Sequence, residues 1–334
     1  MRCAMSKVVH FHRTGDADVL TLDEVAVPAP KNSEVQIDVK AIGLNRAEIM
    51  YRTGQYVIEP QFPAKLGYEA AGIVRAVGSE VRDVVPGDIV SVVPAFSFAD
   101  YGMYGEVVNA PAHAVVKHPS NLSFVEAAAS WMMFVTAYGA LIEYGNLQTG
   151  ETVLIPAASS SVGLAAIQIA NMQGAIPVAL TRTSAKRQAL LDAGAKYVIA
   201  TQEEDLIAEV AAITDGKGAR IVFDPVGGPE ATKLIKSMAN AGIFFQYGAL
   251  DHRDIPVPVF DILGKHLTVR GYELFEITMD MQKLANAKAF VTKGLAGGQL
   301  KPVIDQVFPL TDIAAAHRRM ESNAQIGKIV VVVD

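Results

Sequence analysis

The chain has 334 residues, of which 51% are hydrophobic and 19% charged, so it can bury a substantial core in one large domain or two. Its formal net charge is −6, and no basic run or basic–aromatic interleaving occurs, which excludes nucleic acid as the main partner. The single cysteine, Cys3, excludes an internal disulfide and a cysteine-based metal cluster, as is typical of a reducing compartment.

The N-terminal residues lack the apolar core of a signal peptide. No window of about 20 apolar residues is free of charged or turn residues, so no membrane span is predicted. We therefore expect a cytoplasmic protein.

The first 120 residues or so are predicted to be rich in β-structure. Short apolar runs alternate with glycine and proline, a pattern typical of a partly open barrel. We expect strands at Lys7–Phe11, Val35–Ile42, Ile89–Val93, Gly105–Val108 and Ala114–Lys117, and a bent pair of strands over Leu66–Val77.

From Ser123 the pattern changes to helical spacing. Phe124–Glu143 is predicted as one mostly apolar helix, whose methionine and aromatic residues are more typical of a core than of a cofactor site.

Residues 151–186 predict a strand, a tight turn, a helix and a second strand. The strands are expected at Thr152–Ile155 and Ile176–Leu180, and the helix at Val162–Gln173. Such a βαβ unit lies in a parallel sheet, and its turn can hold the pyrophosphate of a dinucleotide on the N–H groups of the helix N-terminus.

The turn of this unit departs from the usual glycine pattern G-x-G-x-x-G. Ala158, Ser160 and Gly163 stand at the three glycine positions. Small residues leave room for a phosphate, and serine adds a hydroxyl donor. An ordinary turn without a ligand fits the motif as well, so the motif alone leaves both interpretations open.

Strands and helices continue to alternate after this unit. This alternation predicts an α/β fold with a doubly wound parallel sheet. The expected helices are Ala185–Ala193, Asp205–Ile213 and Glu230–Ala239, and the expected strands are Tyr197–Ile199, Ile221–Asp224 and Ile243–Gln246.

Beyond Val257 the alternation ends. The tail is bounded by strands, as the N-terminal part is, so we expect it to return and complete the first domain. Its expected strands are Leu267–Tyr272, Val303–Pro309 and Gly327–Asp334, and its expected helices are Met281–Lys293 and Ile313–Glu321.

Several segments, spread in order over nearly the whole chain, resemble one family. They are GLNRAEIMYRTGQY (Gly43–Tyr56), LGYEAAGIVRAVGSEV (Leu66–Val81), TAYGAL (Thr136–Leu141), VLIPAASSSVGLAAIQIA, LLDAGAKYVI, VFDPVGG (Val222–Gly228) and GKIVVV (Gly327–Val332). The chain resembles the zinc-independent quinone oxidoreductases of the medium-chain dehydrogenase/reductase superfamily.

This resemblance implies a GroES-like β-barrel catalytic domain built from both chain ends, residues 1–122 and 267–334. A Rossmann domain that binds NADPH is inserted between them at residues 123–266. The resemblance also implies a homodimer joined at the edge of the Rossmann sheet, and the apolar segment Ile243–Phe245 is a candidate for an exposed edge.

Zinc-dependent relatives hold the metal with cysteine, histidine and cysteine or glutamate. The resemblance places the first of these positions near Leu44 or Asn45, and the position of the histidine at Tyr68, beside Glu69. A lone glutamate does not complete a zinc site, and the seven histidines show no metal-ligand spacing. We expect no metal, with Glu69 a structural hydrogen-bond acceptor.

The end of the second strand of the βαβ unit indicates which nicotinamide cofactor is bound. Enzymes that use NAD place an acidic residue there, whereas cations and hydroxyls suit the 2′-phosphate of NADPH. This chain has no acid there but Thr181, Arg182, Thr183 and Lys186, which predicts NADPH. Solvated surface charges are the alternative interpretation of the two cations.

The resemblance carries further cofactor contacts to this chain by position. Ser160, Ser161, Val162 and Gly163 are expected at the pyrophosphate, Thr136 near the nicotinamide, Gly248 where the backbone passes close to the cofactor, and Lys328 on the C-terminal strand. For Gly248, a simple turn at the end of a strand is an equally good interpretation.

Asn45 and Tyr56 match family positions near the substrate. Asn45 is predicted to position the substrate through its amide, and Tyr56 to donate a phenol proton. Alternatively, Asn45 caps a helix at Arg46–Tyr51 and Tyr56 packs in a loop. Arg52 is expected to stabilise a carboxylate, a phosphate or the loop itself, and the sequence does not distinguish these three roles.

Three functions follow from this reasoning. The first is an NADPH-dependent, metal-free reductase of quinones, and the second is a 2-enoyl or alkenal double-bond reductase. The third is an NADPH-binding structural or regulatory protein with little turnover. The physiological acceptor stays open, because the candidate pocket residues suit flat rings and a dry core equally well; they are Phe96, Phe98, Tyr101, Tyr104, Trp131 and Phe134.

Overall fold

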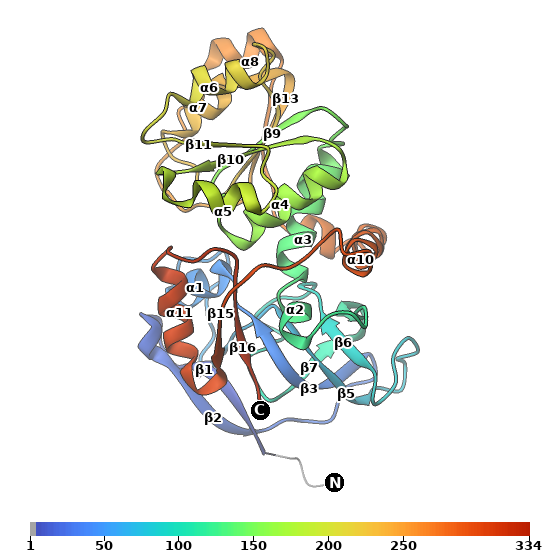
Figure 1. Cartoon of the computed structure of the whole chain (residues 1–334). Helices are drawn as coiled ribbons and strands as arrows, with labels where there is room; N and C mark the ends of the chain where they lie inside the picture. The colour runs from blue at the N-terminus through green and yellow to red at the C-terminus, as the bar shows by residue number, and fades with distance from the viewer. Residues whose placement is uncertain (1–4) are drawn as a thin grey trace. The chain divides into compact units, whose positions relative to one another are not determined.

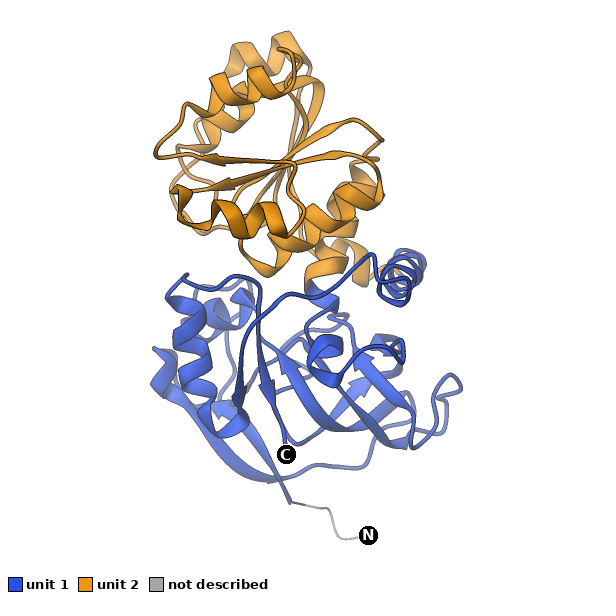
Figure 2. Ribbon diagram, viewed as in Figure 1, with its two compact units in different colours: residues 1–132, 281–334 blue, residues 133–280 orange. Residues whose placement is uncertain are grey.

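The computed structural model describes residues 5–334, so Cys3 and the expectation attached to it lie outside the described residues. The chain divides into two compact units (Figure 2). Unit 1 combines the N-terminal part, up to Met132, with Met281–Asp334, and unit 2 is Met133–Asp280. The divisions fall at residues 132 and 280, whereas the sequence placed them at 122 and 266.

Local packing explains both divisions. Helix α2 (Phe124–Ala128) packs against two strands of unit 1, β3 (Glu34–Gly43) and β5 (Glu69–Val77), and so remains with that unit. Strand β14 (Thr268–Gly271) pairs with β13 (Met238–Gln246) and therefore belongs to unit 2.

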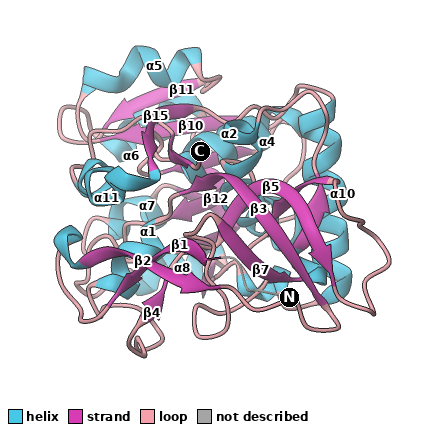
Figure 3. Cartoon of the chain, turned by 90° about the horizontal axis from the view of Figure 1, so that it is seen from below, coloured by secondary structure: helices cyan, strands magenta, loops and turns pink. Residues whose placement is uncertain are grey.

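Unit 1 contains a seven-stranded sheet in which β15-β16-β3-β5-β6-β8 lie in order and β7 also pairs with β3. A three-stranded sheet, in the order β2-β1-β4, accompanies it. Figure 3 shows β3 and β5 as long neighbouring strands. The other strands are β1 (Met5–Phe11), β2 (Leu20–Ala26), β4 (Ala64–Lys65), β6 (Ile89–Val92), β7 (Val107–Pro111), β8 (Val115–Lys117), β15 (Ile304–Pro309) and β16 (Lys328–Val332).

The C-terminal tail returns to unit 1, as expected. Strand β16 runs antiparallel to β3 and parallel to β15, so both ends of the chain share one sheet. The helical elements of unit 1 are η1 (Ala17–Val19), α1 (Arg46–Arg52), η2 (Ala112–Ala114), α2, α10 (Met281–Ala296), η5 (Leu310–Asp312) and α11 (Ile313–Glu321).

Unit 2 is a doubly wound α/β domain. Its six strands are all parallel and lie in the order β11-β10-β9-β12-β13-β14. Helices α4 (Ser161–Met172) and α5 (Arg187–Asp192) cover one face of the sheet, and α6 (Leu206–Ile213), α7 (Ala231–Lys236) and α8 (Val259–Lys265) cover the other (Figure 1). The predicted fold class is confirmed.

Up to β13 the elements of unit 2 alternate along the chain as the sequence predicts, but the alternation does not end at Val257, because helix α8 and strand β14 continue it. Strand β9 (Thr152–Ile155) has the predicted bounds. The others are α4 (Ser161–Met172), β10 (Ile176–Thr181), η4 (Ser184–Lys186), α5 (Arg187–Asp192), β11 (Tyr197–Ala200), α6 (Leu206–Ile213), β12 (Ala219–Asp224), α7 (Ala231–Lys236), α8 (Val259–Lys265) and α9 (Phe275–Thr278).

The helix predicted over Phe124–Glu143 is wrong as a single element. It is divided into α2, α3 (Trp131–Tyr138) and a π-helical turn, η3 (Gly139–Tyr144). Ser123 caps α2 through a capping box with Glu126. Helix α3 starts anew because the carboxylate of Glu69 accepts the backbone N–H groups of Trp131 and Met132.

Two expectations about strands are also corrected. Leu66–Val77 is not a strand pair, because Gly67 precedes β5 and Gly72 pairs within it with Val39 and Val90. Ile243–Phe245 is not an exposed edge, since β13 lies between β12 and β14 and its Phe244 and Phe245 are fully buried. The edge strand beside it is β14.

No helix in the described part of the chain combines the length and apolar character needed to cross a membrane.

Gly163 in the first turn of α4 allows a close backbone approach. A Cβ atom at this position would lie 2.6 Å from the carbonyl oxygen of Ala158 and 2.7 Å from its Cα. We expect Gly163→Ala to destabilise unit 2 by about 1–3 kcal/mol, because backbone atoms cannot yield as a flexible side chain can. Calorimetry measures the effect. Glu209→Ala, at an exposed position of α6 in the same unit, is the control, and an equal transition temperature in the two variants would contradict the prediction.

Candidate functional site

In unit 2 the loop after β9 is a turn of small residues that leads into α4. Ser160 is the N-cap of this helix, and its Oγ accepts the backbone N–H of Gly163 at 3.1 Å. Ser161, Val162 and Gly163 form the first turn, where backbone N–H groups have no acceptor within the helix. The turn therefore has the geometry and the partial positive charge that suit a pyrophosphate.

The end of β10 lies beside this serine turn. Thr181 is the last residue of the strand, and Arg182 and Thr183 follow as exposed residues. The Nζ of Lys186 donates to the Oγ of Ser159 at 3.1 Å. The structure thus brings the predicted phosphate-binding lysine to the predicted pyrophosphate turn.

One acidic residue near this loop was missed by the sequence analysis. Glu203 follows β11, and its Oε1 accepts the backbone N–H of Ser184 at 3.1 Å. No local motif marks this residue, because the sheet brings the ends of β10 and β11 together from positions about twenty residues apart. Its carboxylate orders the loop that carries Lys186.

Thr136 and Gly248 have internal contacts. Thr136 is buried in α3, and its carbonyl oxygen accepts the hydroxyl of Tyr272 at 3.0 Å. A Cβ atom at Gly248 would lie 2.8 Å from the carbonyl oxygen of Pro225. This close packing against the loop after β12 explains why a glycine follows β13, and the explanation needs no bound ligand.

Two residues at the carboxyl ends of β12 and β13 were also missed, the buried Asp224 and the half-buried Tyr247. Asp224 is fully buried, and its carboxylate accepts the backbone N–H groups of Val226 and Gly227. Burial raises the pKa of Asp224 to about 6, against the effect of those two hydrogen bonds. The ring of Tyr247 stacks on Phe223 at a centroid distance of 3.9 Å.

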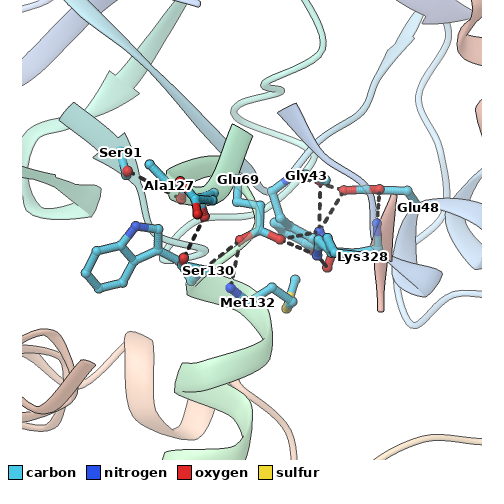
Figure 4. Close-up of polar contacts among 12 residues, drawn as sticks. Gly43, Glu48, Glu69, Ser91, Ala127, Ser130, Met132 and Lys328 are labelled. Atoms are coloured by element: carbon cyan, nitrogen blue, oxygen red, sulfur yellow. Dashed lines mark hydrogen bonds and ion pairs between the residues drawn. The ribbon is translucent and has the colours of Figure 1, made fainter. Parts of the chain in front are cut away.

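In unit 1 a buried ion pair joins Glu69 of β5 to Lys328 of β16. The two side chains are 0% and 1% exposed, and Lys328 Nζ contacts Glu69 Oε1. Glu69 Oε2 accepts the backbone N–H groups of Trp131 and Met132, each at 2.9 Å. Figure 4 shows this carboxylate between Lys328 and the start of α3. Lys328 is therefore committed to a contact within the chain.

Asn45 lies against the same ion pair. Its Oδ1 accepts Lys328 Nζ at 2.5 Å, and its Nδ2 lies within 3.2–3.3 Å of Gly43 O, Glu69 Oε1 and Glu48 Oε1. Asn45 is also the N-cap of α1, whose third residue, Glu48, accepts the backbone N–H of Asn45. Asn45 therefore occupies the N-cap position of α1, but its side-chain amide contacts the Glu69–Lys328 ion pair and makes no capping hydrogen bond to the helix.

The residues around Glu69 do not fit a catalytic zinc ion. Both oxygens of its carboxylate accept hydrogen bonds, and its neighbours at the ligand positions of zinc-dependent relatives are Asn45 and Tyr68. A catalytic zinc site needs three protein ligands and an open position. Among residues 5–334, no three histidine, cysteine, aspartate or glutamate side chains gather closely enough to hold a metal ion.

Glu48 is a second buried carboxylate in this cluster. Its Oε2 accepts the hydroxyl of Tyr104 at 2.7 Å and the backbone N–H of Asn45 at 2.6 Å, and its Oε1 accepts the backbone N–H of Tyr68 at 3.2 Å. Burial raises the pKa of Glu48 to about 7, although these hydrogen bonds and the charge of Lys328 act in the opposite direction.

Contacts that the sequence analysis missed decide the role of Arg52. It is fully buried, forms an ion pair with Glu321 of α11, and lies 3.2 Å from Nδ1 of His317. His317 Nε2 lies 3.1 Å from the hydroxyl of Tyr104. Burial, with the charge of Arg52, lowers the pKa of His317 to about 3, so this ring is neutral at neutral pH. Arg52 thus ties α1 to α11.

Tyr56 stands at the margin of an aromatic cluster. Its hydroxyl lies 3.3 Å from the hydroxyl of Tyr68, and Phe98 is stacked between the rings of Tyr68 and Tyr51. Most of the predicted pocket residues are buried, which supports a dry core around them; these are Phe96, Phe98, Tyr104, Trp131 and Phe134. Tyr101 is half-buried and donates to Glu34 Oε1 at 2.9 Å.

Two family models match the chain. Residues 31–120 match the alcohol dehydrogenase GroES-like domain, and residues 161–289 match the zinc-binding dehydrogenase domain. Quinone oxidoreductase 1 of Escherichia coli is 32% identical over 98% of this chain and 100% of its own length. The human synaptic vesicle membrane protein VAT-1 homolog is 31% identical over 92% of this chain and 81% of its own length.

Two solved structures are similar to this chain over nearly its whole length. The Escherichia coli quinone oxidoreductase complexed with NADPH has a TM-score of 0.88 and 31% identity, covering 98% of this chain and 99% of that chain. The CurK enoyl reductase has a TM-score of 0.88 and 26% identity, with the same coverage.

The raised pKa of Glu48 generates a prediction for stability. The folded state binds this proton more tightly than the unfolded chain, whose glutamate pKa is 4.5. The contribution of Glu48 to stability is therefore lost as pH rises from about 4.5 to about 7. We expect the unfolding free energy of the wild type, relative to that of Glu48→Gln, to fall across this window by up to about 3 kcal/mol.

Urea unfolding followed by tryptophan fluorescence measures this difference, because the chain's single tryptophan, Trp131, lies in unit 1. Glu59→Gln, which alters an exposed carboxylate of the same unit, is the control. A difference between wild type and Glu48→Gln that does not change with pH, or that rises, would contradict the prediction.

Proposed function

Because the chain belongs to the zinc-independent quinone oxidoreductase-like family of medium-chain dehydrogenases/reductases, we propose that it is an NADPH-dependent oxidoreductase that transfers a hydride to a quinone. The observation that carries this proposal is the similarity, over 98% of the chain, to a quinone oxidoreductase whose structure contains NADPH. The contact between Lys186 and the serine turn independently supports the part of this proposal that concerns NADPH.

The residues of unit 2 fit the cofactor. Ser161, Val162 and Gly163 offer backbone N–H groups at the N-terminus of α4 for the pyrophosphate. Arg182 and Lys186 supply the positive charge that a 2′-phosphate needs, and Thr181 and Thr183 add hydroxyl donors. When bound, NADPH supplies a hydride from its nicotinamide ring.

The residues of unit 1 supply the remaining chemistry. A quinone is a strong acceptor and needs little acid catalysis. An enone needs hydride at its β-carbon, stabilisation of its oxygen and a proton at its α-carbon. Tyr56 is the proton donor in this proposal. The amide of Asn45 already has partners within the chain. In this proposal Asn45 therefore contributes by holding the start of α1 and the Glu69–Lys328 ion pair in place.

A double-bond reductase is the second candidate, and the similarity to the CurK enoyl reductase favours it. A panel of naphthoquinones, benzoquinones, enones and enoyl thioesters, each with NADPH, separates the two candidates. Binding of NADPH without oxidation by any of these acceptors would indicate the third function, that of a structural or regulatory protein.

We further propose a cytoplasmic homodimer joined through the edge strand β14 and the neighbouring helix α8. This helix exposes apolar side chains, with Phe260 85% exposed and Leu263 66% exposed. An edge strand and an apolar helix face form a self-complementary surface when two copies meet about a two-fold axis. Light scattering at micromolar concentration tests this proposal, and a monomer mass would contradict it.

The 2′-phosphate assignment predicts the cofactor preference. We expect Lys186→Met to lower kcat/KM for NADPH about 10- to 100-fold and to leave that for NADH within about threefold, because only NADPH loses a charged partner. Lys217→Met, an exposed lysine elsewhere in unit 2, is the control. Equal losses with both cofactors would contradict the assignment.

The donor role of Tyr56 predicts a dependence on the acceptor. We expect Tyr56→Phe to lower kcat for enones by about 10²-fold, the usual contribution of a positioned acid, and to change quinone turnover much less. Steady-state NADPH oxidation measures both. Unchanged turnover of every acceptor would remove the donor role.

A further inference from the structure

The position of Tyr68 in unit 1 is fixed on several sides. Its side chain is buried, and its ring stacks on Phe98 at a centroid distance of 3.7 Å and an interplanar angle of 26°. Its backbone N–H donates to Oε1 of the buried Glu48. Both the plane of the ring and the path of the backbone are therefore held by contacts that do not involve the phenol oxygen.

The hydroxyl of Tyr68 lies 3.3 Å from that of Tyr56. Tyr56 comes from the loop that follows α1, and its ring contacts Phe98 at 5.9 Å and Tyr51 at 6.3 Å between centroids. A side chain on a loop gains a defined orientation from a hydrogen bond to a rigid partner, and such a bond is stronger where aromatic rings exclude water.

The chemistry of two adjacent phenols is directional. Each phenol donates one hydrogen and accepts through its lone pairs. When the Tyr56 hydrogen points to a substrate oxygen, the Tyr56 oxygen can accept the hydrogen of Tyr68. We propose that Tyr68 is a positioning residue that orients the Tyr56 hydroxyl toward the substrate oxygen and stabilises the phenolate left after proton transfer. This inference rests on the proposed function.

The step balances for an enone. Once hydride forms the C–H bond at the β-carbon, the two π electrons of the double bond shift and leave negative charge on the carbonyl oxygen. The Tyr56 proton passes to that oxygen, which gives an enol and a Tyr56 phenolate. The phenolate accepts the Tyr68 hydrogen bond and regains a proton from water, and the enol becomes the ketone by taking a proton at its α-carbon and releasing one from oxygen.

The location of Tyr68 also distinguishes this chain from zinc-dependent relatives. The resemblance places a metal-binding histidine at this position, beside Glu69. Here Glu69 is neutralised by Lys328, and a phenol takes the place of the histidine. In those relatives the metal polarises the substrate oxygen. Here the same role is assigned to two phenols, with Tyr56 donating to the substrate oxygen and Tyr68 donating to Tyr56.

Tyr68→Phe tests the inference, since it keeps the ring that stacks on Phe98 and removes only the hydroxyl. We expect kcat for enones to fall about tenfold, the effect of one hydrogen bond, and quinone turnover to change less than about twofold. The basic limb of the enone pH profile should move to higher pH, because Tyr56 loses a donor that stabilises its phenolate.

A spectroscopic measurement that does not depend on turnover complements the kinetic test of Tyr68→Phe. In protein labelled with ¹³C at the tyrosine Cζ, NMR titration gives the pKa of Tyr56 directly. We expect this pKa to rise in Tyr68→Phe. An unchanged Tyr56 titration would overturn the inference even if the variant were slower.

Tyr51→Phe is the matched control. Tyr51 stacks on Phe98 from a separate contact at 4.8 Å, and its hydroxyl interacts with the backbone of Gln61 instead of Tyr56. We expect its enone kcat and pH profile to match the wild type. A tenfold loss in Tyr51→Phe would mean that any change in this cluster slows the enzyme, and would overturn the inference.

The double variant separates positioning from structure. In a Tyr56→Phe background, Tyr68→Phe should cause no further loss, because there is no hydroxyl left to orient. A second tenfold loss in that background would assign Tyr68 a purely structural role and would overturn the inference. If the wild type oxidises NADPH with none of the acceptors, the proposed function itself fails, and this outcome is distinct from every result above.

Discussion

The buried carboxylate of Glu69 is the constraint on which unit 1 depends. A carboxylate without exposed surface is tolerated only when a cation and hydrogen-bond donors surround it. Lys328 supplies the cation, Asn45 an amide N–H, and the first turn of α3 two backbone N–H groups. These partners come from the beginning, middle and end of the chain, so the carboxylate holds together segments that the sequence separates widely.

The proposed chemistry is divided between the two units. Unit 2 presents helix N–H groups and cations, which suit the phosphates of a dinucleotide. In unit 1 the ionisable side chains Glu48, Glu69, Arg52 and Lys328 are buried, and each has an ion-pair or hydrogen-bond partner within the chain. In the proposed mechanism the half-buried phenol of Tyr56, at the margin of the aromatic cluster, donates the proton, so the proposed donor is a neutral group.

The sequence predicted the elements well where a local pattern decides them. Strand β9 and helix α11 have the predicted bounds because their apolar spacing is regular. The break before α3 was missed because its cause, the carboxylate of Glu69, lies 62 residues away. The contact of Lys328 with Asn45 spans 283 residues, and no local pattern reports such a pairing. Side-chain partners within a buried cluster are decided by the tertiary fold.

Hydride transfer that relies on the chain's own charges and phenols, without a metal ion, is the central claim. Steady-state NADPH oxidation before and after exhaustive dialysis against a strong zinc chelator tests it most directly, with a naphthoquinone and an enone as acceptors. The result expected is a kcat that is unchanged by chelation and by added zinc. A loss of turnover on chelation that one equivalent of zinc restores would contradict the claim.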